Sequence, residues 1–211
     1  MTKKLVIYGA GGFGREVKSM LPYLAEEYEL LGFLDDGLEV EVEVDGTRVL
    51  GGSDWIKDFS SEIYVVIAIG NPRIKSTVCK QLQKYAQIKF PTMIHSRAHL
   101  QDEKHISIGE GSVIGAGSVL TTGITLGKHV LINLNVTIGH DSVIGNFSSI
   151  MPGVNLSGNV SIGSEVMIGS GANVINKIKI GDFSNIGAGS VVNHDIPAAS
   201  TAAGVPARVI K

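Results

Sequence analysis

The most regular feature of the chain is a repeat of six residues in its second half. An aliphatic residue occupies every sixth position from residue 108 to residue 192, fifteen times in succession. This period matches neither the 3.6-residue period of an amphipathic helix nor the two-residue alternation of a half-buried strand. It is typical of a parallel β-helix built from hexapeptide units, each with one short strand and one corner. The positions are Ile108, Ile114, Leu120, Leu126, Ile132, Ile138, Ile144, Ile150, Leu156, Ile162, Ile168, Val174, Ile180, Ile186 and Val192.

Three units form one triangular coil, so fifteen units predict about five coils in which the aliphatic side chains point inward and stack. Nine of the fifteen are followed directly by Gly, which predicts corners where a Cβ would crowd its surroundings or where φ is positive. The repeat has no insertion, so a partner surface must supply the wall of any substrate site. A second inward position is again small or aliphatic, at Ser112, Ser118, Val130, Val136, Ser142 and Ser148.

The first ninety residues have a different pattern. Apolar runs at 4–8, 29–34 and 64–69 predict strands, and apolar residues at helical spacing predict helices over 15–26 and 73–85. Strands that alternate with helices predict a small parallel α/β sheet of Rossmann type. We therefore expect a Rossmann-like domain over residues 1–90 and a β-helix domain over 91–211, with residues 91–101 as the hinge between them.

Composition excludes several classes of partner. A net charge of -2 and a pI of about 6.3 give no sign of a nucleic-acid or anionic-membrane partner. Cys79 is the only cysteine, which excludes an internal disulfide and suits a reducing cytosol. The apolar run at the start is too short for a signal peptide, and no stretch approaches the ~18 apolar residues of a membrane span. We therefore expect a cytoplasmic protein.

A glycine-rich motif, Gly9-Ala10-Gly11-Gly12-Phe13-Gly14, lies between the first predicted strand and helix. This spacing presents backbone N–H groups at a helix N-terminus, which is an anion site, and Asp35 follows at about the distance of a ribose-binding acid. The motif alone favours NAD, but the domain holds only half of a dinucleotide fold, so one nucleoside diphosphate fits better. The alternative is that the glycines only form a tight turn and allow close packing. We expect pyrophosphate at Gly11, Gly12 and Phe13, and a base or ribose near Asp35, Asp36 and Gly70.

The β-helix is compatible with more than one chemistry. Coenzyme A acyltransferases use the groove between neighbouring prisms, some carbonic anhydrases hold zinc between histidines there, and other hexapeptide proteins are structural. Zinc would need about three converging imidazoles. The histidines of this half are spread over its length and over different corners, so no metal is expected; they are His105, His129, His140 and His194.

His140 is the candidate general base. It occupies the third position of a hexad, where a side chain points outward at a corner. Histidine titrates near neutral pH, so such an imidazole can deprotonate an amine or hydroxyl that attacks a thioester. Asp141 could orient the ring and stabilise the imidazolium, although adjacent side chains need not face each other. The alternative is a solvated surface histidine.

Five segments together resemble the bacterial sugar acyltransferases: VIYGAGGFGREV, FLDD, AIGNP, NVTIGHDSVIGNFSSIMPGVNLSGNV and AAGVPARVIK. This family includes N-acetyltransferases of nucleotide-linked 4-amino sugars and sialic acid O-acetyltransferases, and the resemblance covers essentially the whole chain. It implies a left-handed β-helix and a homotrimer. It also implies that the N-terminal domain binds the nucleotide sugar and that acetyl-CoA lies between adjacent β-helices.

The resemblance also assigns residues. The family's base falls on His140 and its acidic neighbour on Asp141. The chain departs from the family pattern in two respects: relatives often carry His where Ser149 stands, and some carry His or Ser within the glycine-rich loop where Phe13 and Gly11 stand. Coenzyme contacts fall on Ser149, Gly158, Ser170 and Ala188, and sugar-nucleotide contacts on Gly11, Gly12, Phe13, Asp35, Asp36, Gly70 and Asn133.

The sequence therefore predicts an acetyl-CoA-dependent acetyltransferase that acts on the amine of a nucleotide-linked 4-amino sugar by direct transfer, with His140 as base. Two alternatives stay open. One is O-acetylation of sialic acid or another sugar, and the other is a non-catalytic assembly protein that binds a nucleotide sugar or coenzyme A. The nucleotide and the length of the acyl group are also left open.

Overall fold

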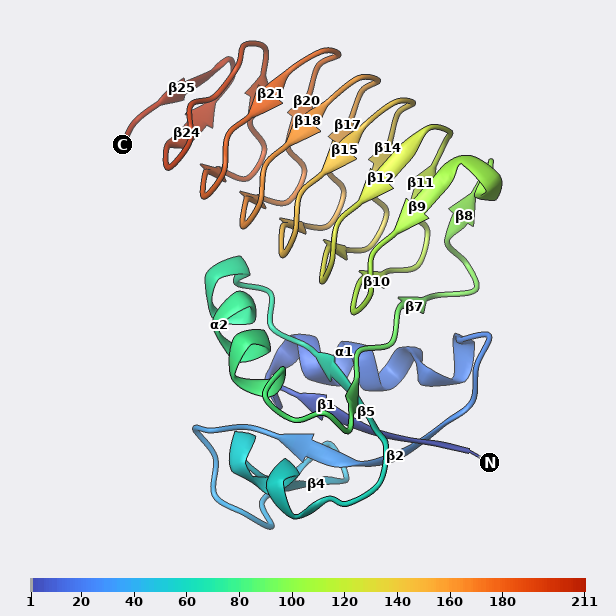
Figure 1. The fold of residues 1–211 in the computed structure, drawn as a ribbon. Coiled ribbons are helices and arrows are strands. Elements are labelled where there is room, and N and C mark those ends of the chain that lie inside the picture. Colours follow the sequence, from blue (N-terminus) through green and yellow to red (C-terminus); the bar gives the residue numbers. More distant parts are fainter. Residues whose placement is uncertain (1) are drawn as a thin grey trace. The chain divides into compact units, whose positions relative to one another are not determined.

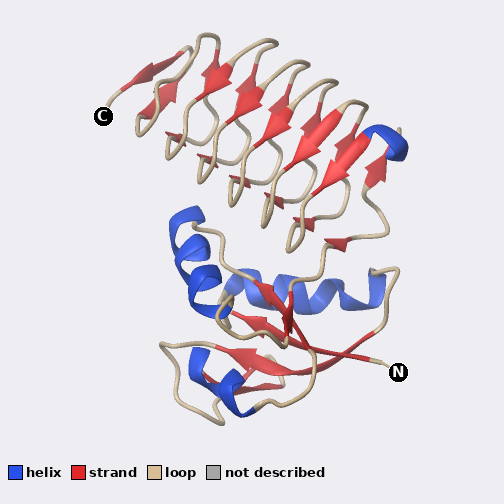
Figure 2. Cartoon of the chain, in the orientation of Figure 1, coloured by secondary structure: helices blue, strands red, loops and turns tan. Residues whose placement is uncertain are grey.

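The computed structural model describes residues 2–211, which form two compact units (Figures 1 and 2). The first unit runs to Gly70 and continues over Ile74–Pro91. The second comprises Asn71–Arg73 and Thr92–Lys211. No helix among the described residues combines the length and the apolar character needed to cross a bilayer.

The first unit is built on one sheet with the strand order β3-β4-β2-β1-β5-β6. Central strand β1 pairs in parallel with β2 and β5, as the sequence predicted, whereas the short β3 pairs antiparallel with β4. The buried face of the sheet is aliphatic and aromatic, with Leu5, Ile7 and Phe33 fully buried. The elements are β1 (Lys3–Tyr8), α1 (Gly12–Met20), η1 (Leu21–Tyr23), β2 (Tyr28–Leu34), β3 (Glu43–Val44), β4 (Thr47–Gly51), η2 (Ser53–Asp58), β5 (Ile63–Ile67), α2 (Pro72–Leu82) and β6 (Ile88–Lys89).

The first helix is shorter than the sequence predicted. It ends at Met20 and passes into the 3-10 turn η1 instead of continuing to residue 26. Pro22 has no N–H group and its ring collides with the preceding turn of an α-helix, which costs about 3 kcal/mol and disfavours a continuous helix there. Strands β3, β4 and β6 were not predicted because their short segments carry no long apolar run.

The second unit is a left-handed β-helix whose strands stack into three faces, visible as the repeated coils of Figure 1. Face 1 contains β7, β10, β13, β16, β19, β22, β24 and β25; face 2 contains β8, β11, β14, β17, β20 and β23; face 3 contains β9, β12, β15, β18 and β21. The strands are β7 (Met93–Ile94), β8 (His99–Leu100), β9 (Ile106–Ile108), β10 (Val113–Ile114), β11 (Val119–Leu120), β12 (Ile124–Leu126), β13 (Leu131–Ile132), β14 (Thr137–Ile138), β15 (Val143–Ile144), β16 (Ser149–Ile150), β17 (Asn155–Leu156), β18 (Ser161–Ile162), β19 (Met167–Ile168), β20 (Asn173–Val174), β21 (Lys179–Ile180), β22 (Asn185–Ile186), β23 (Val191–Val192), β24 (Thr201–Gly204) and β25 (Ala207–Val209), with the 3-10 turn η3 (Glu103–His105) before β9.

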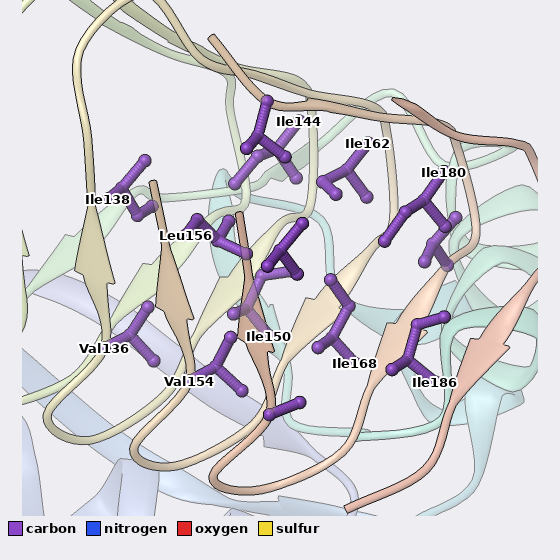
Figure 3. Close-up of a cluster of buried hydrophobic side chains, with 14 of the residues drawn as sticks. Val136, Ile138, Ile144, Ile150, Val154, Leu156, Ile162, Ile168, Ile180 and Ile186 are labelled. Carbon is purple, nitrogen blue, oxygen red and sulfur yellow. The ribbon is translucent and has the colours of Figure 1, made fainter. Parts of the chain in front are cut away.

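The six-residue repeat produces the stacking that the sequence predicted. Strand partners such as Thr137 and Asn155 lie 18 residues apart, so each residue has a counterpart directly above it and below it. Fourteen of the fifteen aliphatic positions are buried, and Ile108 is partly buried at the first coil. Figure 3 shows several of them, such as Ile138, Ile150 and Ile168, pointing into the prism. Each contributes roughly 1.5–3 kcal/mol through burial, before the entropy cost of ordering the chain.

The glycines that follow the aliphatic residues serve close packing. A Cβ on Gly109 or on Gly145 would lie 2.5 Å from the backbone carbonyl carbon of the glycine one coil later. The prediction of crowding is therefore confirmed. The alternative, a positive φ at these glycines, is wrong: left-handed conformations occur two residues further on, at positions such as Gly111 and Phe147.

The β-helix begins earlier than predicted, inside the stretch assigned to a hinge. β7 and β8 already pair with β10 and β11. Met93 is the partner of Val113, an offset of 20 residues, whereas Ser107 is the partner of Thr125 at the regular offset of 18. The two additional residues accompany η3, and they hide the first coil from a search for a strict period of six.

Inward-facing serines connect successive coils. The Ser148 hydroxyl is fully buried, donates to the Gly163 carbonyl at 2.7 Å and accepts from the Val166 N–H at 3.0 Å. Ser112 and Ser118 make the same pair of bonds, to a carbonyl 15 residues on and an N–H 18 residues on. The serines at the second inward position therefore pair corner groups that would otherwise be buried without a partner.

The variant Ser148→Ala should lose this connection. It leaves the Val166 N–H and the Gly163 carbonyl buried without the hydroxyl, which costs about 1–3 kcal/mol of unfolding free energy. Urea unfolding at fixed protein concentration measures the loss. Ser161→Ala on β18, where the side chain is exposed, is the matched control and should leave the midpoint unchanged. Equal midpoints for the two variants would contradict the role assigned to the buried serine.

Candidate active site

The first unit contains a pocket of about 440 Å³ at the carboxyl ends of its parallel strands. Ligands of open α/β sheets bind at this edge. Gly11, Gly12, Phe13, Asp35, Asp36 and Gly70, the predicted sugar-nucleotide residues of this domain, all line the pocket. Tyr8, Gly9, Gly37, Ala68, Ile69, Ile74 and Val78 complete its lining.

The glycine-rich loop serves two purposes at different residues. Gly9 has φ 104° and a Cβ on Gly14 would overlap the Gly9 carbonyl, so these two glycines allow the tight turn and close packing. A Cβ on Gly11 or Gly12 would meet nothing within 4 Å. Helix α1 starts here with no side-chain cap and no acidic residue in its first turn. Its amide groups and the positive end of its dipole are therefore suited to an anion such as a pyrophosphate.

Asp35 fixes the loop from the end of β2. Its carboxylate accepts one hydrogen bond from the Ala10 N–H and one from the Gly37 N–H, both at 2.9 Å. The half-buried carboxylate thus connects the glycine-rich loop to the segment after β2. Each oxygen retains a second lone pair that can accept from a ligand hydroxyl or N–H group.

Asp36 organises the opposite wall of the pocket. Its carboxylate accepts from the Ser53 N–H at 2.8 Å, at the start of η2, and from the Tyr8 hydroxyl. Burial, together with the hydrogen bond to Asp36, raises the pKa of Tyr8, so this hydroxyl remains a donor at neutral pH. The sequence pattern did not identify Tyr8 or Ser53 as partners of Asp36. The available signal for Tyr8 was a polar group at the end of an apolar strand that leads into the loop.

His140 and Asp141 form a pair on the corner between faces 2 and 3, immediately after β14. His140 Nδ1 lies 2.9 Å from Asp141 Oδ2, and the two side chains are 60% and 62% exposed. Asp141 has φ 57°, a left-handed conformation that lets its carboxylate turn back to the neighbouring ring. The bond to Nδ1 leaves Nε2 as the nitrogen that can take a proton from a substrate.

The other predicted residues of the β-helix lie at different places. Gly158 is on the same corner as His140, one coil later, because Thr137 pairs with Asn155. Ser170 and Ala188 are exposed on the corner between faces 1 and 2. Asn133 is on that second corner but is buried, with its Oδ1 accepting from the Leu134 N–H at 2.7 Å. Ser149 is on β16 and is fully buried.

The expected spread of the histidines over different corners is wrong for His105, His140 and His194, which all follow strands of face 2, although on different coils. Within residues 2–211, no group of three or more His, Cys, Asp or Glu side chains is arranged to hold a metal ion. The His140–Asp141 pair and the glycine-rich pocket are two clusters with a recognisable chemistry, and a second exposed pair, His105–Asp102, lies on the same corner in the first coil with 2.8 Å between Nδ1 and Oδ2.

Family models match both units. Residues 4–82 match the PglD N-terminal domain. Residues 141–176 match the bacterial transferase hexapeptide, and residues 105–138 and 159–194 match the hexapeptide repeat of succinyl-transferase.

Curated relatives include serine acetyltransferases. That of Haemophilus influenzae is 41% identical over 136 residues, which is 64% of this chain and 45% of the relative. That of Bacillus subtilis is 54% identical over 41 residues, 19% of each chain. The chain thus spans less than half the length of these two curated relatives.

Solved structures match over the full length. The acetyltransferase domain of PglB from Neisseria gonorrhoeae is 34% identical, with a TM-score of 0.91 and coverage of 99% of this chain and 100% of that one. WeeI from Acinetobacter baumannii is 32% identical, with a TM-score of 0.88 and coverage of 99% and 100%. PerB from Caulobacter crescentus, solved with CoA and GDP-perosamine, is 26% identical, with a TM-score of 0.89 and coverage of 100% and 99%. The match to the PglB domain, together with the family models, shows that this chain belongs to the bacterial sugar acyltransferases with a PglD-type N-terminal domain and hexapeptide repeats.

Proposed function

We propose that the protein transfers the acetyl group of acetyl-CoA to the amine of a nucleotide-linked 4-amino sugar. The observation that carries this proposal is the exposed His140–Asp141 pair, a general base with its orienting carboxylate on an open edge of the prism. The relatives support the choice of substrates: PerB was solved with CoA and GDP-perosamine, and the PglB domain with acetyl coenzyme A.

The nucleotide sugar occupies the pocket of the first unit in this proposal. The pyrophosphate lies against the start of α1 at Gly11 and Gly12, where a Cβ would meet nothing within 4 Å and no side chain caps the helix. Asp35 and Asp36 then accept from hydroxyl or N–H groups of the ribose or base. Both carboxylates are already fixed by backbone N–H groups, so binding costs little additional side-chain conformational entropy.

His140 acts as general base in a direct transfer. Its Nε2 takes the proton from the sugar amine as the nitrogen attacks the thioester carbon. The new N–C bond forms, the C–S bond breaks, and the imidazolium returns the proton to the departing thiolate. Asp141 holds the ring through Nδ1 and stabilises the imidazolium. A positioned base of this kind contributes about 10²–10⁴-fold to the rate.

The active site is completed by a second copy of the chain in a homotrimer. His140 and the predicted coenzyme residues Ser170 and Ala188 lie on different corners, at opposite edges of face 2. In a ring of three prisms, the His140 corner of one copy can face the Ala188 corner of the next. The coenzyme would then lie between them, which supplies the wall that a loop-free prism lacks.

The general base is tested by thiol release from acetyl-CoA with UDP-, dTDP- and GDP-linked 4-amino sugars and with sialic acid. One 4-amino sugar should be acetylated, and His140→Ala should lower kcat by about 10²–10⁴-fold. His194→Ala is the matched control, because His194 has the same corner position three coils later, and it should retain wild-type kcat. Wild-type turnover in His140→Ala would remove the base from the proposal. Release only with sialic acid would move the enzyme to O-acetylation, and binding of coenzyme without any release would favour the non-catalytic alternative.

The shared active site is tested by mixing two inactive variants, His140→Ala and Ala188→Trp, and reassembling them at equal concentration. A site formed by two copies regains about one quarter of wild-type activity, because one site in four combines the two intact corners. The unmixed variants are the controls. Activity that stays at background in assembled mixed trimers would show that both corners act within one chain.

The nucleotide pocket is tested by calorimetric titration of UDP, dTDP and GDP. Asp36→Ala removes the acceptor of the Ser53 N–H and of Tyr8, so the preferred nucleotide should bind at least about tenfold more weakly, a loss of ~1.4 kcal/mol. Asp58→Ala, an exposed change at the end of η2, should bind as the wild type does. Equal affinity of both variants would place the nucleotide elsewhere.

A further inference from the structure

We infer that Gly123 and Gly158 are positioning residues for the proposed catalytic pair, His140 and Asp141. Gly158 leaves open the space that the His140 ring occupies, and Gly123 leaves open the space that the Asp141 carboxylate occupies. Gly158 lies one coil after His140 and Gly123 one coil before Asp141. This inference rests on the proposed role of His140. Each glycine acts through the side chain that it contacts, Gly158 through His140 and Gly123 through Asp141.

The backbone of the corner is fixed from both sides. The Asp141 N–H donates to the Thr122 carbonyl at 3.0 Å, toward the previous coil. The His140 carbonyl accepts from the Asn159 N–H at 2.7 Å, toward the next coil. With the backbone held in this way, the observed placement of the imidazole and the carboxylate requires the space that adjacent coils leave open beside them.

Gly158 leaves the space for the imidazole. A Cβ at this position would overlap Nε2 of His140 and lie 2.6 Å from Cε1 and 2.8 Å from Cδ2, closer than the 3.0 Å that Cβ contacts essentially never go below. The backbone itself does not require a glycine, because φ of Gly158 is outside the left-handed region. The same corner position in other coils carries Thr122, Asn176 and His194.

Gly123 leaves the space for the carboxylate. A Cβ here would lie 2.6 Å from Asp141 Oδ1 and 3.3 Å from its backbone N. Gly123 does have a positive φ of 66°, but Asn159 and Lys177 adopt φ 60° and 64° at the equivalent position of later coils. A residue with a side chain is therefore compatible with this conformation, and the feature particular to Gly123 is the carboxylate above it.

The two glycines together define the direction of the base. Asp141 is held back over Gly123 and bonds Nδ1, while the ring extends over Gly158 with Nε2 nearest to it. The atom that gives up its proton must therefore approach Nε2 along the edge of the prism beside Gly158. Misplacement of a catalytic group by about 1 Å can cost on the order of 100-fold in rate, which sets the expected size of the effect.

The experiment compares Gly158→Ala and Gly123→Ala with the wild-type full-length chain in the thiol-release assay. Gly158→Ala should lower kcat by about 10- to 100-fold and leave KM for the nucleotide sugar unchanged. Gly123→Ala should lower kcat by about tenfold, since it displaces only the orienting carboxylate. A rise in KM for acetyl-CoA without a fall in kcat would instead assign Gly158 to coenzyme contact alone and overturn the inference.

A double-variant measurement separates positioning from general damage. In the His140→Ala background, Gly158→Ala should cause no further loss of the residual rate, followed as transfer of radiolabelled acetyl, because the ring it displaces is gone. An additive loss would contradict the inference. For the strain of Ala at positive φ, Gly46→Ala in the turn between β3 and β4 is the control: its φ is 67° and its Cβ would meet nothing within 4 Å. It should lower Tm as much as Gly123→Ala does but keep wild-type kcat.

The outcome also distinguishes the two proposals. If His140→Ala retains full activity, the proposed base is wrong, whatever the glycine variants do. If His140→Ala is inactive while Gly158→Ala and Gly123→Ala, both folded by Tm, turn over like the wild type, only the positioning role is overturned.

Discussion

The constraint on which the structure depends is the registration of each coil of the β-helix on the next. Backbone hydrogen bonds join residues 18 positions apart, so every side chain has a fixed neighbour above and below. Inward aliphatic side chains form the continuous core, and the buried serines bond backbone carbonyl and N–H groups at the corners. In a parallel stack of this kind the backbone hydrogen bonds fix where each outward side chain begins, so no loop is needed to position it.

This registration explains how an exposed corner can hold the proposed catalytic pair, His140 and Asp141, in a defined geometry. A surface histidine is ordinarily mobile, but the backbone at His140 and Asp141 is bonded to both adjacent coils. The carboxylate bonds the ring, and the absence of a Cβ at Gly123 and Gly158 leaves room for the two groups where they lie. The pocket of the first unit uses another device for the same purpose: Asp35 and Asp36 bond backbone N–H groups before any ligand arrives.

Much of the fold followed from the sequence because its signals are local. The period of six predicted the prism and its inward positions. The six residues of the first unit that were predicted to bind the sugar nucleotide line one pocket, and their contact with a nucleotide stays a prediction. The errors have physical causes. Pro22 ended α1 early, and two residues near η3 hid the first coil. Tyr8 and Ser53 bond Asp36, and Gly158 packs against His140, but in each case the partners are distant in sequence. No local sequence pattern therefore predicts these contacts.

The central claim is that His140 accepts the proton of a sugar amine held between two copies of the chain. A crystal structure with coenzyme A and the preferred nucleotide sugar tests it most directly, through the distance from His140 Nε2 to the acceptor nitrogen. The account predicts a hydrogen bond of about 2.7–3.2 Å, with the pyrophosphate at the start of α1 and the coenzyme on the Ala188 corner of a neighbouring copy. An acceptor nitrogen bound away from this edge of the prism, with another side chain in contact, would contradict it.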